Sequence, residues 1–161
     1  MLTIRLKLVL LISSRRKKNV LEWLEKKLTG CDKLITWHGN GFDIPFIMSR
    51  AIVQKVYFAG LAELPMLDLY EWCRENLILS SYSLGSVSRF LGVKMGKSFK
   101  EFRGGDILTL FKLIERGDYE ARKLIVDHCK DDIIALKLVH DRTKSMVERS
   151  EGSLRRVLKE E

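Results

Sequence analysis

Apolar and polar positions alternate at the start of the chain and then take up helical spacing. Every second residue from Leu2 to Leu8 is apolar, and this period of two predicts a strand. Apolar residues next recur at every third or fourth position, and Asn19 suits the N-cap of the helix that this spacing predicts. The predicted order is a strand at 2–12, a helix from 19 that ends near Gly30, a strand at 33–37 and a helix at 43–53. Such an alternation is typical of α/β layer structures.

Helical spacing dominates the chain from Leu67 onward. Helices are predicted at 67–77, 83–91 and 106–116, and at 118–149 as one long helix or two. Residues 150–161 are dense in charge and are expected to fray or project. The predicted organisation is therefore one domain at 1–149 followed by a charged tail at 150–161.

Composition narrows the class of protein. Of the 161 residues, 46% are apolar and 31% are charged, which suits one soluble globular domain. The three cysteines form no CxxC pair, so neither a disulfide framework nor a zinc site is indicated, and a reducing cytoplasm is the expected location. The apolar start is too short to span a bilayer, and most of its positive charge follows it, unlike in a signal peptide. No membrane partner is therefore expected.

The net charge points to a polyanion. A formal charge of +8 favours nucleic acid or another anionic surface, and the alternative is a charge-rich protein of a hot or acidic habitat. One basic cluster lies at 15–18, and Phe99 and Phe102 interleave with a second, where they would stack on bases unless they pack in the core. The second cluster of candidate phosphate contacts consists of Lys94, Lys97, Lys100 and Arg103.

The stretch from Trp37 to Ile47 is the first candidate site. A predicted strand ends there, a turn with Gly39 and Gly41 follows, and Asp43 opens a helix. This places a carboxylate at the carboxyl edge of a sheet, where α/β proteins usually build their sites. The alternative is that Asp43 only caps the helix and interacts with its dipole.

The second candidate site is a pair of residues on the last predicted helix. His128 and Asp132 are four positions apart, so they share one helix face. A histidine and an aspartate placed in this way can orient a water and hold a metal ion. A surface pair without further function is the alternative.

Together the two stretches resemble the DEDD superfamily of 3′–5′ exonucleases, which share the ribonuclease H-like fold and include the proofreading domains of family B DNA polymerases. The family's second motif is Asn, three residues and then Phe-Asp, commonly followed by an apolar residue and Pro, and Phe42–Pro45 matches it. The third motif places Tyr or His three or four residues before Asp, as in His128 and Asp132. Segments between the motifs are also similar, and the resemblance spans roughly Leu2 to His140. These segments are Met66–Leu69, Tyr82–Gly92 and Gly117–Glu120.

The resemblance implies a fold and a set of site residues. The implied fold is α/β and ribonuclease H-like, with a mixed central sheet that is flanked by helices and short of its first strand. Asp43 and Asp132 would bind Mg²⁺ or Mn²⁺, and His128 would position or deprotonate the water. A single-stranded 3′ end of DNA or RNA would be contacted by His38, Asn40 and Phe42, and the second basic cluster adds Lys97, Lys100 and Arg103 to the expected contacts.

Two departures from the family pattern bear on activity. The family's first motif, Asp-x-Glu on the opening strand, supplies two of its four metal-binding carboxylates, but residues 2–12 contain no acid. The Asp118–Glu120 stretch has that spacing but stands at a predicted helix start, where the family has a structural Gly-Asp turn. His38 occupies the position of the family's Asn, and Asn40 lies two residues further on.

Three explanations of the missing acids stay open. The acids lie upstream in a longer reading frame, another chain completes the site, or the domain is a degenerate relative kept for binding. The function expected from the sequence is a metal-dependent 3′–5′ exonuclease with an incomplete site. The alternative is a catalytically inactive nucleic-acid-binding or scaffold domain, and a third hypothesis is a partner-binding subunit without a nucleic-acid role.

Overall fold

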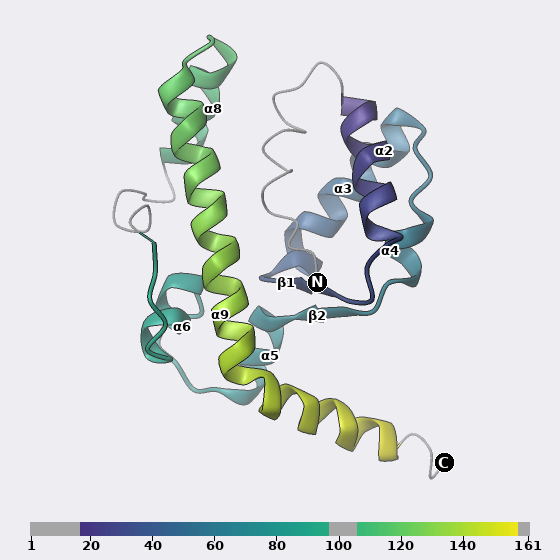
Figure 1. The fold of residues 1–161 in the computed structure, drawn as a ribbon, viewed down its shortest axis with the longest axis vertical. Coiled ribbons are helices and arrows are strands. Elements are labelled where there is room, and N and C mark those ends of the chain that lie inside the picture. The colour runs from purple at the N-terminus through teal and green to yellow at the C-terminus, as the bar shows by residue number, and fades with distance from the viewer. Residues whose placement is uncertain (1–16, 97–105, 158–161) are drawn as a thin grey trace.

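The fold is seen in a computed structural model that describes residues 17–96 and 106–157 (Figure 1). Helices make up most of the described chain, and its strands are short. In chain order the elements are α2 (Lys17–Leu28), β1 (Leu34–Thr36), the π-helical turn η1 (Gly39–Asp43), α3 (Ile44–Gln54), α4 (Ala59–Glu63), β2 (Met66–Asp68), α5 (Leu69–Asn76), α6 (Leu84–Phe90), α8 (Asp106–Glu115) and α9 (Tyr119–Val157).

The centre of the described fold is a pair of parallel strands. β1 and β2 pair with Ile35 opposite Leu67 and Thr36 opposite Asp68. The chain crosses from one strand to the other through η1, α3 and α4, because parallel strands cannot be joined by a tight hairpin. Both strands therefore end at the same edge of the sheet, where β1 leads into η1 and β2 leads into α5.

Helices cover both faces of this sheet. Leu34 packs in a cluster with α2, α3 and α4, whereas Ile35 packs in a second cluster with α5, α6 and α9. Successive side chains of a strand point to opposite faces, which accounts for this division. Figure 1 shows the same arrangement, with α2, α3 and α4 on one side of the strands and α9 on the other. The described chain therefore has three layers, with helices on both sides of the central sheet.

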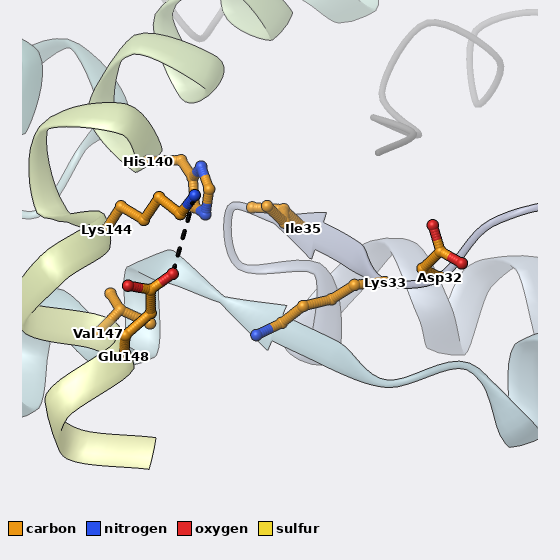
Figure 2. A pocket seen from close by; sticks show the side chains of 7 residues that line it. All are labelled: Asp32, Lys33, Ile35, His140, Lys144, Val147 and Glu148. Carbon is orange, nitrogen blue, oxygen red and sulfur yellow. Dashed lines mark ion pairs between the residues drawn. The ribbon is translucent and has the colours of Figure 1, made fainter. Parts of the chain in front are cut away.

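A pocket separates the start of β1 from the second half of α9 (Figure 2). Its volume is about 330 Å³, and an ion pair joins Lys144 to Glu148 at 3.8 Å on the α9 side. Both side chains of this pair are largely exposed, so the pair contributes little to stability. The lining consists of Asp32, Lys33, Ile35, His140, Lys144, Val147 and Glu148.

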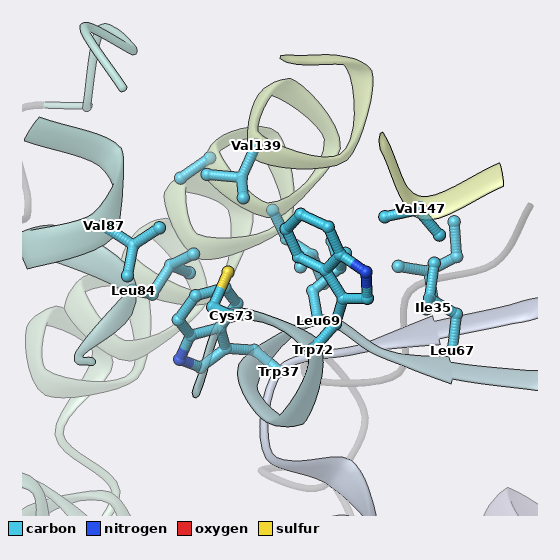
Figure 3. Packing of buried hydrophobic residues seen from close by; sticks show 12 residues of the cluster. Ile35, Trp37, Leu67, Leu69, Trp72, Cys73, Leu84, Val87, Val139 and Val147 are labelled. Carbon is cyan, nitrogen blue, oxygen red and sulfur yellow. The ribbon is translucent and has the colours of Figure 1, made fainter. Parts of the chain in front are cut away.

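The larger apolar cluster joins the sheet to α9 (Figure 3). Trp37 and Trp72 lie among aliphatic side chains from β1, β2, α5, α6 and α9, and Val139 on α9 is fully buried. The indole Nε1–H of Trp72 donates to Ser150 Oγ at 3.1 Å, so the polar atom of this buried ring is satisfied. This cluster fixes α9 across one face of the sheet.

Most of the predicted elements are confirmed. The strand at 33–37 and the helices at 43–53, 83–91 and 106–116 are present within one or two residues of their predicted ends. The long C-terminal pattern is a single helix, α9, and this helix continues through the predicted tail boundary to Val157. The predicted strand at 2–12 lies outside the described residues.

Two predictions about element boundaries are wrong. Asn19 does not cap a helix, because α2 already begins at Lys17. The helix predicted at 67–77 begins only at Leu69, because Leu67 and Asp68 belong to β2. The apolar spacing of that segment fits both a strand end and a helix start, and pairing with β1 decides in favour of the strand.

The described sheet agrees in part with the expected fold. A central sheet flanked by helices is present, but its two strands within residues 17–96 and 106–157 are parallel rather than mixed. None of the described helices has a stretch that is both long and apolar enough to cross a membrane.

Leu34→Ala tests the position of β1 between the two layers. The Leu34 side chain is fully buried, so its truncation leaves a cavity and should lower the free energy of unfolding by about 2–5 kcal/mol in urea titrations. Ile78→Ala is the control, because Ile78 is fully exposed in a loop and its change should stay within about 0.5 kcal/mol. Equal effects of the two substitutions would contradict the layer assignment.

Candidate active site at the carboxyl edge of the sheet

The turn that follows β1 has an unusual backbone. His38 adopts the left-handed conformation with φ of 57°, and residues 39–43 form one π-helical turn before α3 begins. Single π-helical turns are rare and occur often at functional sites. The turn is also tight: a Cβ on Gly39 would lie 2.5 Å from Thr36 Cβ, and a Cβ on Gly41 would meet the ring of His38. Both glycines are therefore needed for close packing of the turn.

A buried carboxylate from β2 holds this turn. Asp68 is 6% exposed, and its Oδ1 accepts hydrogen bonds from the backbone N–H of His38 at 2.8 Å and of Tyr70 at 3.1 Å. Its Oδ2 accepts from the backbone N–H of Asn40 at 3.0 Å. Asp68 thus caps α5 and fixes the turn after β1 at the same time. The sequence shows Asp68 only as part of a short Asp-Leu segment, and its role depends on the register of the two strands.

The first turn of α5 makes two further contacts with the same turn. Asn40 Nδ2 donates to Glu71 Oε2 at 2.9 Å, and the rings of His38 and Tyr70 meet edge to face at 4.5 Å between centroids. His38 and Asn40, both predicted to contact nucleic acid, are exposed at this edge. The Asn40 amide is oriented by Glu71, and the His38 ring is supported by Tyr70.

Asp43 occupies the N-cap position of α3 but does not cap the helix with its side chain. Its side chain is 7% exposed, and it forms no capping hydrogen bond with the first turn of α3. The capping hydrogen bond of the alternative is therefore absent, whereas the position at the start of α3 remains suited to an interaction with the helix dipole. Asp43 lies at the end of η1, at the carboxyl edge of the sheet, as predicted.

The residue before Asp43 is a large exposed aromatic. Phe42 is 57% exposed and stacks on Phe46 with an interplanar angle of 16° and centroids 6.3 Å apart. The guanidinium of Arg50 lies 5.2 Å from the centre of the Phe46 ring. We call Phe42, Phe46 and Arg50 the aromatic surface. Two parallel rings beside a cation resemble the platforms on which single-stranded bases stack.

His128 and Asp132 lie close together on α9. His128 Nε2 is 3.9 Å from Asp132 Oδ2, and the side chains are 20% and 6% exposed. The predicted shared face is therefore confirmed. A partly exposed imidazole that lies beside a buried carboxylate can accept a proton from a water at the surface of the helix.

The residues described do not form a complete metal centre. Within residues 17–96 and 106–157, no three His, Cys, Asp or Glu side chains converge so that they could hold a metal ion together. The oxygen donors of Asp43 and Asp132 suit Mg²⁺ or Mn²⁺ in chemical type but are too few for a two-ion site. The assignment of these two acids as metal ligands stays a prediction.

The predicted basic contacts fall largely outside the described residues. Lys97, Lys100 and Arg103 lie in the segment 97–105, which the structure does not describe. Gly96, the residue before it, lies directly against Asp131, since a Cβ there would be 2.0 Å from the Asp131 carboxyl carbon. Gly96 therefore lies beside α9, at the residue that precedes Asp132.

The cysteines do not contribute a nucleophile to the site. Cys73 and Cys129 are buried, and burial raises the pKa of the Cys73 thiol to about 11. A buried thiol with a raised pKa is unreactive. Cys31 follows the C-terminus of α2 and donates its thiol hydrogen to the carbonyl of Lys27 in the last turn of that helix, at 3.2 Å. All three cysteines are free, as expected from their spacing.

The pocket beside α9 is distinct from the candidate site. Its lining includes Lys33, before β1, whereas Asp43 follows the other end of that strand. On α9 the nearest lining residue, His140, lies two turns beyond Asp132, a separation of about 12 Å along the helix axis.

Gly39→Ala tests the tight turn. The added methyl group would overlap the buried side chain of Thr36, and we expect a loss of about 1–3 kcal/mol in the free energy of unfolding. Gly30→Ala is the control, because the nearest atom to its added Cβ is 3.8 Å away. Urea titrations measure both, and a neutral Gly39→Ala would show that the turn is looser than described.

Comparison with known proteins identifies the family. A family model described as the RNase_H superfamily matches residues 5–144, which is most of the chain. No curated protein and no solved structure matches the chain. The match spans both candidate stretches and the described sheet, and it supports a nuclease-like domain with a ribonuclease H-like fold. On the match over residues 5–144, this chain belongs to the RNase H superfamily.

Proposed function

We propose that this chain acts on single-stranded nucleic acid ends as a metal-dependent 3′–5′ exonuclease domain whose site is completed by carboxylates beyond Asp43 and Asp132. The observation that carries the proposal is the burial of two consecutive residues: the aromatic Phe42 is exposed, and the acidic Asp43 that follows it is buried. A base stacked on the aromatic surface would bring its phosphate to the edge of the sheet where Asp43 lies. Superfamily membership supports binding of nucleic acid.

The preference for a single strand follows from the exposed aromatic surface. The Phe42 ring offers a flat face that bases in a duplex cannot reach, because they are already stacked on one another. The net charge of +8 supplies the attraction to phosphates that any such binding needs. The resemblance to 3′–5′ exonucleases supports a 3′ end as the terminus that is bound.

The chemistry of the proposed reaction is hydrolysis of the terminal phosphodiester. Water adds to phosphorus, the bond from phosphorus to the 3′ oxygen of the preceding nucleotide breaks, and that oxygen takes up a proton. A 5′-mononucleotide leaves, and the shortened strand keeps a 3′ hydroxyl. His128, which lies beside Asp132 on α9, would accept the proton of the attacking water.

A second candidate function rests on the sparse set of acids. Because no group of three or more carboxylates, histidines or cysteines within the described residues could hold a metal ion, the chain by itself would bind a strand without cutting it. In that case the domain would serve as a nucleic-acid-binding or scaffold module. Acids supplied by a partner chain would separate this function from the first.

Phe42→Ala tests binding on the aromatic surface. Loss of the exposed ring should weaken binding of a fluorescein-labelled oligothymidine by about 1–3 kcal/mol in anisotropy titrations at fixed salt. Phe90→Ala is the matched control, since Phe90 is 62% exposed on α6, and its removal should leave the affinity unchanged. Equal losses for both variants would indicate nonspecific binding rather than a stacking site.

Asp43→Asn and Asp132→Asn test catalysis. With 5′-labelled single strands and Mn²⁺, stepwise 3′ shortening by the chain should fall by about 10²-fold or more in each variant, because a carboxamide is a poor ligand for a hard cation. Asp127→Asn is the control on α9, where Asp127 forms an exposed pair with Lys130 at 2.9 Å. Binding without any shortening by the unaltered chain would support the second function instead.

A further inference from the structure

We propose that Asp68 is the positioning residue of the candidate site, and that its carboxylate sets the backbone on which Phe42 and Asp43 are presented. The inference rests on the proposed function, since it concerns the same site. Asp68 itself touches no substrate: its oxygens are occupied by three backbone N–H groups, those of His38, Asn40 and Tyr70.

The strand register puts Asp68 where it can do this. Thr36 lies opposite Asp68, so the last residue of β2 stands beside the point at which the chain leaves β1. The backbone N–H groups of His38 and Asn40 are directed to the two oxygens of one carboxylate. Such charge-assisted bonds in a buried setting are stronger than bonds between neutral groups.

The turn needs such a hold because its backbone is strained. A left-handed residue other than glycine costs free energy and persists only where the surroundings determine it, and His38 is left-handed here with φ of 57°. Asp68 accepts from the N–H of this strained residue and from the N–H of Asn40, two residues further along the turn. Release of the Asn40 N–H would free the start of η1, and the orientation of Phe42 and Asp43 would change with it.

Two substitutions separate positioning from helix capping. In Asp68→Asn, the amide oxygen can keep the bonds from His38 and Tyr70, but its NH₂ group would face the Asn40 N–H. In Asp68→Ser, the hydroxyl can still cap α5 but is too short to reach the turn. Asp118→Asn is the matched control, because Asp118 caps α9 by accepting from the N–H of Ala121 at 3.0 Å and does not touch the turn.

The experiment combines backbone amide exchange with strand binding. Amide exchange measured by NMR should become about tenfold faster at Asn40 in Asp68→Asn, and at both His38 and Asn40 in Asp68→Ser. Binding of labelled oligothymidine should weaken about tenfold in both variants. Asp118→Asn should change neither quantity, even where its melting temperature falls as far.

The outcomes distinguish this inference from the proposed function. Unchanged exchange at His38 and Asn40 in both Asp68 variants would overturn the positioning role, whether or not the protein binds a strand. Altered exchange with unchanged strand affinity would also overturn it, since the turn would then not set the binding surface. No binding by the unaltered protein, with faster exchange in the variants, would overturn the proposed function and leave Asp68 as a purely structural residue.

Discussion

The parallel pairing of β1 with β2 is the constraint on which the rest of the described structure depends. It is only three residues long, yet it brings the ends of both strands to one edge and places Thr36 beside Asp68. The strand pair also divides the apolar side chains between two clusters, through Leu34 on one face and Ile35 on the other. Without this register, neither the three layers nor the turn at the edge would form.

The buried carboxylate of Asp68 holds the turn at the edge of the sheet. An ionised carboxylate taken out of water is costly unless it is hydrogen-bonded, and Asp68 meets this condition with backbone N–H groups alone. Backbone donors are less mobile than Lys or Arg side chains, so the bonds also fix geometry. The carboxylate satisfies donors that the turn and the start of α5 would otherwise bury without partners.

The sequence predicts those elements of the fold whose formation depends on residues close together in the chain. The spacing of Leu21, Leu24 and Leu28 identifies α2, and the His128–Asp132 spacing identifies a shared helix face, because both depend on helix geometry alone. Asn19 misleads, since a residue that suits a cap also occurs inside helices where solvent satisfies it. The start of the helix after Asp68 could not be predicted, because strand pairing with a segment some thirty residues away decides it.

The sequence identifies only part of the candidate site, because some of its interactions join residues that are far apart in the chain. Phe42 and Asp43 stand out because a glycine-containing turn precedes an acid and a proline, which is a pattern within one short stretch. Asp68 belongs to the site through three hydrogen bonds, and two of these reach back to residues 38 and 40. No local pattern around Asp68 distinguishes this role from that of an ordinary helix cap.

Phe42 and Asp43 depart, at consecutive positions, from the usual burial of their residue types. Large apolar side chains are usually buried, yet Phe42 is 57% exposed, and acids are usually solvated, yet Asp43 is 7% exposed and does not cap its helix. Proteins break such rules mainly where function requires it. We propose that a nucleic acid end suits this pair because it presents a flat base and a charged phosphate at adjacent positions: the base would extend the stack of Phe42 on Phe46, and the phosphate would approach the Asp43 carboxylate through bound cations.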